Sequence, residues 1–303
     1  MIKSLTITNH LGDSILLELM RPEKSGFVVK NVDGLGPVKA NINMTASATC
    51  DGAMYNSAFM ESRDIVISLL YYQTNNETIE DIRQKSYKYF PNKKKIHIRI
   101  ETDNRIVWTE GYVEDNIPAI FSNESGCVIT IRCPDPHLYS INENNTIFYG
   151  VDPLFEFPLE NSSTEEKLLN MGDIIHTNTA VVFNEGDCDV GCTIIIDVIG
   201  SVSNILIYRN SGSEKMIIDA GKIPSTLGSQ IVSGDTIVIE TSIGNKSIVL
   251  IRDGIQHNIL NCLSKDSTWF TLSEGDNIFS YAVGEGDDDV RFRITNKIVY
   301  NGV

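Results

Sequence analysis

The histidines and cysteines, the residue types that most often bind metals or act as nucleophiles, are scattered along this 303-residue chain. The histidines are His10, His97, His137, His176 and His257, and none forms a metal-binding or catalytic pair. The cysteines are Cys50, Cys127, Cys133, Cys188, Cys192 and Cys262. Cys188 and Cys192 are the closest pair, but they lack the partner ligands of a zinc site. We therefore interpret the cysteines as free thiols in a reducing compartment and expect no disulfide framework.

An acidic tract at residues 284–289 is the densest group of charges. Neighbouring carboxylates could hold Ca²⁺ through oxygen ligands. The tract lacks the full spacing of a calcium loop, however, and it lies between two strand-like runs, 281–283 and 290–294. We interpret it as a solvated hairpin tip, and a metal bound by Asp287, Asp288 and Asp289 stays an open alternative.

Trp269 and Phe270 are the most aromatic pair in the sequence. An exposed tryptophan on a β-sandwich could stack on a sugar ring, whereas a buried pair would fill the core. The core interpretation is the one that we favour.

The charge of the chain argues against nucleic acid as a partner. The formal net charge is −15 and the isoelectric point is about 4.7, so there is no excess of basic residues to neutralise phosphates. The basic run at Lys93, Lys94 and Lys95 lacks interleaved aromatic residues, and we interpret it as solvated. We expect no signal peptide, because residues 1–6 lack a continuous apolar core, and no membrane span, because no uninterrupted apolar stretch has the required length.

Sequence motifs of catalysis are also missing. The chain has no phosphate-binding loop, no dinucleotide-binding fingerprint and no nucleophile elbow. The members of a Ser/His/Asp triad are neighbours in space rather than in sequence, and nothing in this sequence points to such a triad. We therefore expect a protein that is not an enzyme and that acts through its surfaces. We assign no catalytic residue, cofactor or metal, and the binding residues are unknown.

The first part of the chain is predicted to be mostly β with one helix. The helix is predicted at Ile79–Tyr89, because Thr78 and Asp81 form a capping-box-like start and Pro91 ends the segment. Apolar and polar residues alternate in the surrounding strands. These strands are predicted at Ser4–Thr8, Ser14–Leu19, Phe27–Val32, Arg63–Tyr72, 96–101 and Ile106–Glu114.

The second part is predicted to be all β, and no helix is expected there. Short apolar runs alternate with Gly, Asn and Asp turn signals, as is typical of a sandwich. These runs are Ala180–Phe183, Thr193–Ile199, Ile205–Arg209, Lys215–Ile218, Asp235–Thr241, Ser247–Arg252, Ile278–Val283 and Asp289–Ile294.

A stiff corner at Cys133-Pro134-Asp135-Pro136-His137 separates the two parts, because each proline fixes its own backbone and restricts the residue before it. The predicted fold is mainly β, with two β-sandwich-like domains at 1–137 and 138–303. In an alternative, a last strand at 289–300 returns to the first domain and makes the boundary discontinuous.

Motifs in a consistent order over nearly the whole chain resemble the distal tail proteins of siphophages. The motif at the corner, residues 133–136, is the most specific, and no single one of the others would suffice. They are Gly34-Leu35-Gly36-Pro37, Asp51-Gly52, Arg63-Asp64-Ile65, Tyr89-Phe90-Pro91, Gly111–Glu114, Asn184-x-Gly186-Asp187, Asn204–Tyr208, Gly234-Asp235, Trp269-Phe270-x-Leu272, Gly275-x-Asn277 and Tyr300-x-Gly302-Val303. The chain departs from the family pattern at His137, where an aromatic residue is usual, and at Glu240, where Asp is frequent.

The resemblance implies a structural protein of the virion that is assembled in the host cytoplasm. The first domain would close into a six-fold ring that continues the tail tube, and the second would be a galectin-like or carbohydrate-binding-module-like sandwich. The ring would join the tube protein to the tail-tip and receptor-binding proteins. Two alternatives stay open at this point: a carbohydrate-binding protein that recognises host cell-wall polysaccharide through Trp269, and a cell-wall hydrolase with two carboxylates in a cleft.

Overall fold

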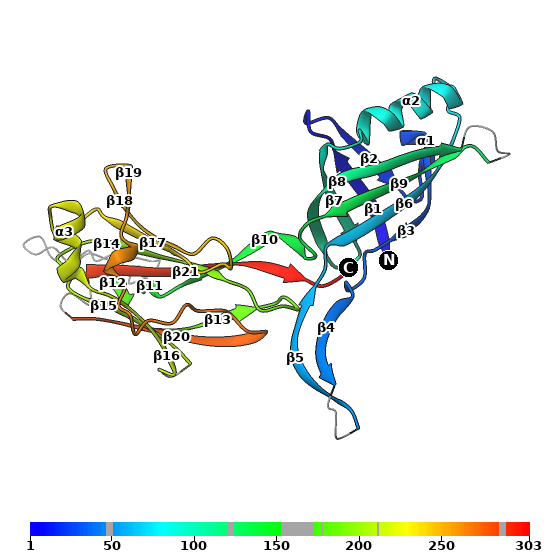
Figure 1. The fold of residues 1–303 in the computed structure, drawn as a ribbon. Helices are drawn as coiled ribbons and strands as arrows, with labels where there is room; N and C mark the ends of the chain where they lie inside the picture. The colour runs from blue at the N-terminus through cyan, green and yellow to red at the C-terminus, as the bar shows by residue number, and fades with distance from the viewer. Residues whose placement is uncertain (47–50, 120–123, 153–172, 177, 211, 285–288) are drawn as a thin grey trace, which may run out of the picture. The chain divides into compact units, whose positions relative to one another are not determined.

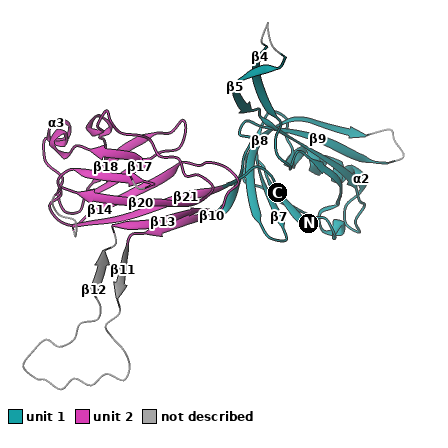
Figure 2. Ribbon diagram, turned by 90° about the horizontal axis from the view of Figure 1, so that it is seen from below, with its two compact units in different colours: residues 1–141, 299–303 teal, residues 142–298 magenta. Residues whose placement is uncertain are grey.

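Two compact units divide the chain in the computed structural model, which describes residues 1–46, 51–119, 124–152, 173–176, 178–210, 212–284 and 289–303 (Figure 1). Unit 1 comprises residues 1–141 and 299–303, and unit 2 comprises residues 142–298 (Figure 2). The chain leaves unit 1 within strand β10 (Leu138–Ile147) and returns to it within strand β21 (Val290–Tyr300).

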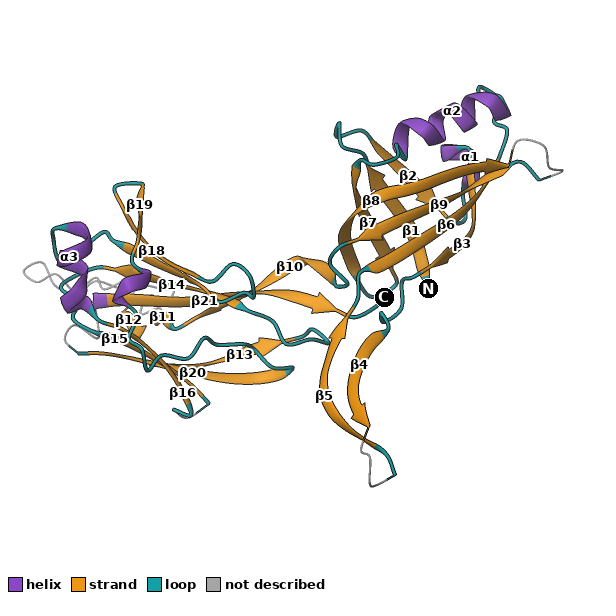
Figure 3. Cartoon of the chain, in the orientation of Figure 1, coloured by secondary structure: helices purple, strands orange, loops and turns teal. Residues whose placement is uncertain are grey.

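Strands dominate both units, and the mainly β fold class predicted from the sequence is confirmed (Figure 3). In unit 1, one run of neighbouring antiparallel strands has the order β2-β1-β7-β8, and another has the order β3-β6-β9-β8. These strands are β1 (Ile2–Thr8), β2 (Ser14–Glu18), β3 (Phe27–Asp33), β6 (Arg63–Tyr71), β7 (Lys95–Thr102), β8 (Ile106–Ala119) and β9 (Gly126–Cys133).

The long strand β8 belongs to both runs. Its first half pairs with β7, and its second half pairs with β9 across a register shift between Val113 and Asp115. Such a bulge bends a strand, and here it lies where β8 changes from pairing with β7 to pairing with β9. Ile96, Ile98 and Ile100 of β7 are fully or almost fully buried, as their alternation with polar residues predicted.

Helix α2 (Ile79–Tyr89) belongs to unit 1 and has the predicted bounds. The capping box is present: the Thr78 side chain accepts from the Asp81 N–H, and the Asp81 carboxylate accepts from the Thr78 N–H. A one-turn helix, α1 (Pro22–Ser25), adds to the one helix expected in this part of the chain. A separate two-stranded sheet, formed by β4 (Ala40–Ala46) and β5 (Ala53–Met60), was not predicted from the sequence.

Unit 2 is built from two antiparallel layers around one core. One layer has the order β19-β18-β17-β14-β21, and the other has the order β13-β20-β15-β16. The strands are β13 (Thr179–Asn184), β14 (Cys192–Val198), β15 (Ile205–Arg209), β16 (Glu214–Ile218), β17 (Thr236–Glu240), β18 (Ser247–Arg252), β19 (Ile255–Asn258) and β20 (Gly275–Val283). A short ladder of β11 (Tyr149–Asp152) and β12 (Asp173–His176) is separate from both layers. Inward-facing residues of the two layers form a continuous apolar core.

The expectation of no helix in the second part was wrong in detail. Helix α3 (Ile223–Leu227) lies between β16 and β17, and single 3₁₀ turns lie at Ala220–Lys222 and Leu260–Cys262. Pro224 is pre-organised for the first turn of α3, and Gly228 ends the helix with φ +79°. A helix of five residues is too short for the hydrophobic periodicity on which the sequence analysis relied.

Candidate functional site

Metal-binding groups are not found in the described part of the chain. No three or more His, Cys, Asp or Glu side chains among those residues lie close enough to hold a metal ion. Cys192 is fully buried and Cys188 half-buried, and both are free thiols. Burial, partly offset by the Thr241 hydroxyl, raises the pKa of Cys192 to about 12, so that this thiol stays protonated. Cys50 and residues 285–288 of the acidic tract lie outside the described residues.

The histidines whose side chains are described are His10, His97, His137 and His257. His97 stacks on Trp108 with ring centroids 5.0 Å apart, His137 contacts Asp135, and His10 and His257 lie elsewhere on the two units. Burial lowers the pKa of His97, and Glu110 opposes this shift.

The basic run is a turn and the start of a strand. Lys93 adopts a left-handed backbone with φ 63°, and the Lys95 Nζ lies 2.6 Å from the Glu110 Oε2. One of its three cations is thus already paired with an acid of the same unit.

Trp269 and Phe270 both contribute to packing in unit 2. Phe270 is fully buried and contacts Phe279 edge-to-face at 5.4 Å. Trp269 is half-buried against the same core, and the Lys246 ammonium lies 5.5 Å from its ring centroid. The prediction that this pair fills the core is confirmed for Phe270. Trp269 packs against the core with only part of its side chain.

Arg63 is the centre of a buried polar cluster, which we call the Arg63 clasp. The residue is only 1% exposed, and its guanidinium donates four hydrogen bonds, all to main-chain carbonyls. Nε donates to Pro136 at 2.7 Å, Nη1 to Gly34 at 2.6 Å and to Gly36 at 2.7 Å, and Nη2 to Asn301 at 2.6 Å. The clasp therefore joins three segments of unit 1 that lie far apart in the sequence.

The loop at residues 34–37 is shaped for this contact. Gly34 has φ +86°, and a Cβ there would lie 1.9 Å from the carbonyl oxygen of Asp64. Only glycine combines that backbone with that close approach. The C-terminal residues pack on the same loop, since the Val303 N–H donates to the Leu35 carbonyl at 3.1 Å.

Electrostatics within the clasp favour a fixed arrangement. Burial lowers the pKa of the Arg63 guanidinium, while Cys133 and Asp135 oppose the shift, and an arginine remains protonated in any case. Burial also raises the pKa of the Cys133 thiol to about 11. Burial opposes ionisation of Asp135, but hydrogen bonds from the His137 side chain, the Tyr139 hydroxyl and the His137 N–H outweigh it and lower its pKa to about 2. The predicted corner is thus held by an ionised aspartate.

The β4–β5 hairpin is an exposed surface of different character. Every residue of both strands is exposed, and in Figures 1 and 2 the hairpin extends away from the other strands of unit 1. The register places Ile42 opposite Ala58, Met44 opposite Tyr55, and Ala40 opposite Met60. Directly opposed residues share one face of a ladder, so this face, which we call the apolar hairpin face, carries no charged side chain.

The opposite face of the hairpin is mixed, with Asn41, Asn43, Thr45 and Ser57 beside the exposed Phe59 and Met54. Asn43 donates to the Ser57 hydroxyl at 3.1 Å, and Asn56 donates to the Thr45 hydroxyl at 2.6 Å. An isolated two-stranded hairpin is marginally stable in water. Contiguous exposed apolar side chains such as those of the apolar hairpin face are typical of interaction surfaces.

Neither Arg63 nor the hairpin was singled out as a site from the sequence. The motif Arg63-Asp64-Ile65 was noted, but nothing in a sequence shows that an arginine at the start of an apolar strand points inward. The hairpin carries a weak signal, the alternation of Ala40, Ile42, Met44 and Ala46 with polar residues, which is typical of a strand.

The described residues thus form two mainly β units, and one of them carries an exposed apolar hairpin. No helix in the described residues is long and apolar enough to cross a membrane. No protein-family model matches the sequence, and a search of curated proteins gave no match.

Solved structures, in contrast, match over nearly the whole chain. The crystal structure of the Dit protein of phage SPP1 has a TM-score of 0.63 at 12% identity, and the alignment covers 97% of this chain and 98% of that one. Structures of the phage p2 baseplate in its activated conformation with Sr and with Ca give TM-scores of 0.42 and 0.43 at 10% identity, covering 96% and 97% of this chain and 97% and 98% of theirs. The resemblance inferred from the ordered motifs is confirmed at the level of the fold, which is that of a phage distal tail protein.

Proposed function

We propose that this chain is a structural component of a phage or prophage tail. Six copies form a ring at the distal end of the tail tube, and the ring connects the tube to tail-tip and receptor-binding proteins. The similar SPP1 protein is described as a paradigm of the hub of the adsorption apparatus in phages that infect Gram-positive bacteria. Unit 1 supplies the contacts that close the ring, and unit 2 carries contacts to other tail proteins.

The apolar hairpin face is the observation that carries this proposal. Ile42 is 51% exposed, Met44 57% and Tyr55 62%, although all three lie on one face of one ladder. Burying such side chains against a neighbour stabilises by about 25 cal/mol for each Å² removed from water. A ring places a neighbouring copy beside every hairpin, so that each face is covered in the same way.

The two alternatives have less support. Sugar stacking on Trp269 would need an open aromatic face, but this ring packs partly against the core and lies beneath the Lys246 ammonium. A hydrolase would need two convergent catalytic carboxylates in a cleft. Of two pockets with described linings, one has a single carboxylate side chain, that of Asp103. In the other, Glu23 is accompanied by Glu77, which is engaged in an ion pair.

The proposal is tested by light scattering on the full chain after size-exclusion chromatography, together with negative-stain images. We expect rings of six copies with a central hole. The double substitution Ile42→Lys/Met44→Lys should abolish the ring, because it places charge on the apolar hairpin face. The matched control is Asn43→Lys/Thr45→Lys, which adds the same charges to the opposite face of the same strand.

Both variants should stay folded, because every residue of β4 is exposed. Circular dichroism checks this. Rings that persist in the first variant, or that are lost equally in both, would contradict the role of the apolar hairpin face. A chain that remains monomeric even with tube and tip proteins present would contradict the ring itself.

A further inference from the structure

A polar pocket of about 540 Å³ lies in unit 1, away from both the Arg63 clasp and the hairpin. It is lined by residues of α1, of α2 and of the loop that joins β6 to α2: Glu23, Lys24, Tyr72, Gln73, Thr74, Asn75, Asn76, Glu77 and Lys85. Its volume falls within the range of small-molecule sites.

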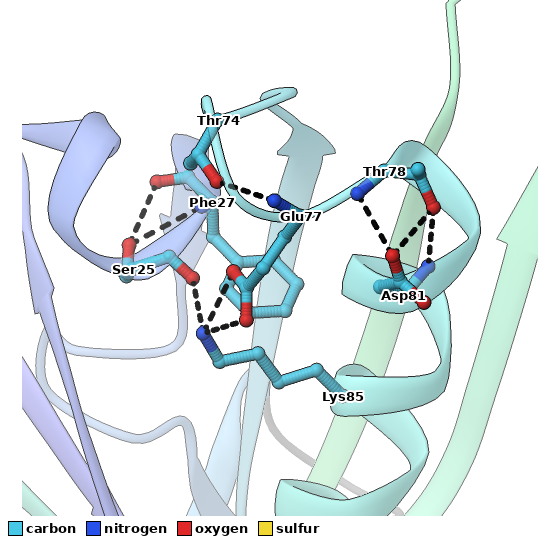
Figure 4. A network of polar contacts seen from close by, with 7 residues as sticks. All are labelled: Ser25, Phe27, Thr74, Glu77, Thr78, Asp81 and Lys85. Atoms are coloured by element: carbon cyan, nitrogen blue, oxygen red, sulfur yellow. Dashed lines mark hydrogen bonds and ion pairs between the residues drawn. The ribbon is translucent and has the colours of Figure 1, made fainter.

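The walls of this pocket are held by a hydrogen-bond network (Figure 4). The Lys85 Nζ donates to the Ser25 carbonyl at 3.1 Å and to both carboxylate oxygens of Glu77 at 3.2 Å. The Glu77 N–H donates to the Thr74 hydroxyl at 3.1 Å, and the Tyr72 N–H donates to the Gly26 carbonyl at 2.8 Å. The loop is therefore fixed at its two ends before any ligand arrives, which lowers the entropic cost of binding.

Three of the side chains that line the pocket without hydrogen-bond partners are amides. Within the described residues, the side chains of Gln73, Asn75 and Asn76 form no hydrogen bond, and each offers both a donor pair and an acceptor. Tyr72, a residue that is 45% exposed, adds an aromatic side chain. A ring with an apolar face beside free amides matches a ligand that carries both hydroxyl groups and a C–H face.

The charges of the pocket decide against an anionic ligand. The Lys24 ammonium is paired with Glu18 at 2.7 Å and the Lys85 ammonium with Glu77 at 3.2 Å. Glu23 has no ion-pair partner in the described part of the chain. A phosphate or carboxylate would meet no free cation here, and it would be repelled by Glu23.

From these observations we infer that this pocket binds a neutral saccharide, with Tyr72 beneath a pyranose ring and the amides on its hydroxyl groups. The inference does not depend on the ring or on Trp269. It assigns a saccharide site to unit 1, whereas the alternative considered from the sequence placed sugar binding at Trp269 in the second domain.

Saturation-transfer difference NMR on the full chain tests this inference, because the method tolerates a large assembly. The probes are maltose, lactose and diacetylchitobiose, with glycerol phosphate as an anionic comparison. We expect saturation transfer to at least one of the three disaccharides, with a dissociation constant on the order of 1 mM. Tyr72→Ala and Asn76→Ala should each weaken that binding by about tenfold or more.

Tyr87→Ala is the matched control, because Tyr87 is an exposed tyrosine of α2 that does not line the pocket. It should bind as the unsubstituted chain does. The inference is overturned if none of the three disaccharides receives saturation at about 10 mM, if Tyr72→Ala and Asn76→Ala bind unchanged, or if glycerol phosphate binds better than all of them. Light scattering on the same samples keeps the two proposals distinguishable, since ring formation should be the same with and without Tyr72.

Discussion

Each unit contains one deeply buried arginine, and the two are stabilised in opposite ways. Arg63 in unit 1 donates only to main-chain carbonyls, from segments as distant as Gly34 and Asn301. Arg209 in unit 2 is 6% exposed and donates to side chains: the Glu214 carboxylate at 2.7 Å, the Ser273 hydroxyl at 2.9 Å and the Asn277 amide oxygen at 3.0 Å. One charge is solvated by backbone, the other by a carboxylate and two polar side chains.

The two arginines differ in the hydrogen-bond acceptors that lose their donor when the arginine is replaced. The carbonyls around Arg63 belong to the main chain, so they cannot rotate to new partners as a side chain can. The Glu214 side chain is 34% exposed, so it can be hydrated when its partner is lost. A buried acceptor without a donor costs about 1–3 kcal/mol, whereas a hydrated carboxylate costs much less. Arg63 should therefore matter more than Arg209, although both are buried arginines.

Arg63→Met should have the largest effect. We expect the free energy of unfolding of unit 1 to fall by about 3–5 kcal/mol, because four carbonyls lose their donor at once. The chain has two tryptophans, Trp108 in unit 1 and Trp269 in unit 2, so a Trp269→Phe background makes urea unfolding of unit 1 visible through Trp108 fluorescence.

Arg132→Met, in the same background, is the matched control for Arg63→Met. Arg132 lies on the neighbouring strand β9 with its side chain 53% exposed and is paired with Asp64. Its loss should cost less than about 1 kcal/mol. Equal effects of the two substitutions would show that the backbone cage of Arg63 is not what stabilises unit 1.

Arg209→Met should have a smaller effect, of about 1–3 kcal/mol on unit 2. The expected loss is smaller because Glu214 becomes hydrated and Asn277 keeps its bonds to the carbonyls of Ser273 and Gly275. Urea unfolding in a Trp108→Phe background reports on unit 2 through Trp269. Glu214→Gln should cost less again, since it keeps an acceptor for Arg209. A loss as large as that of Arg63→Met would remove the distinction between the two arginines.

Strand periodicity made much of each unit predictable from the sequence. The bounds of α2 were predicted because capping by Thr78 and the stop at Pro91 are local chemistry. The apolar alternation of β6, β7 and β15 likewise needs no knowledge of distant residues. The β4–β5 hairpin was missed because its apolar residues have no core to face within one chain, and they are interspersed with Asn and Ser.

The clasp could not be predicted, because its contacts are long-range. The motifs at Gly34–Pro37, Arg63, Cys133–Pro136 and Tyr300–Val303 were recognised separately as points of resemblance. The structure brings them together around one guanidinium. In unit 2, the motif at Gly275-x-Asn277 similarly meets Arg209. The sequence shows the order of these motifs along the chain, but only the fold shows that they contact each other.

The smallest expected effect is the pH dependence of the contribution that Asp135 makes to stability. The bonds of Arg63 do not change with pH, whereas Asp135 has a folded pKa of about 2, below the value of about 3.9 for an unfolded chain. Its contribution to stability is therefore fully present above about pH 4 and is lost as the pH falls through about 4 towards 2. Because the Asp135 side chain is 46% exposed, we expect this contribution to be at most about 1 kcal/mol.

The difference in the free energy of unfolding between the unsubstituted chain and Asp135→Asn, measured through Trp108, should become smaller as the pH falls from about 4 to about 2. A difference that stays constant from about pH 5 to about pH 2 would mean that the corner is held without the charge of Asp135.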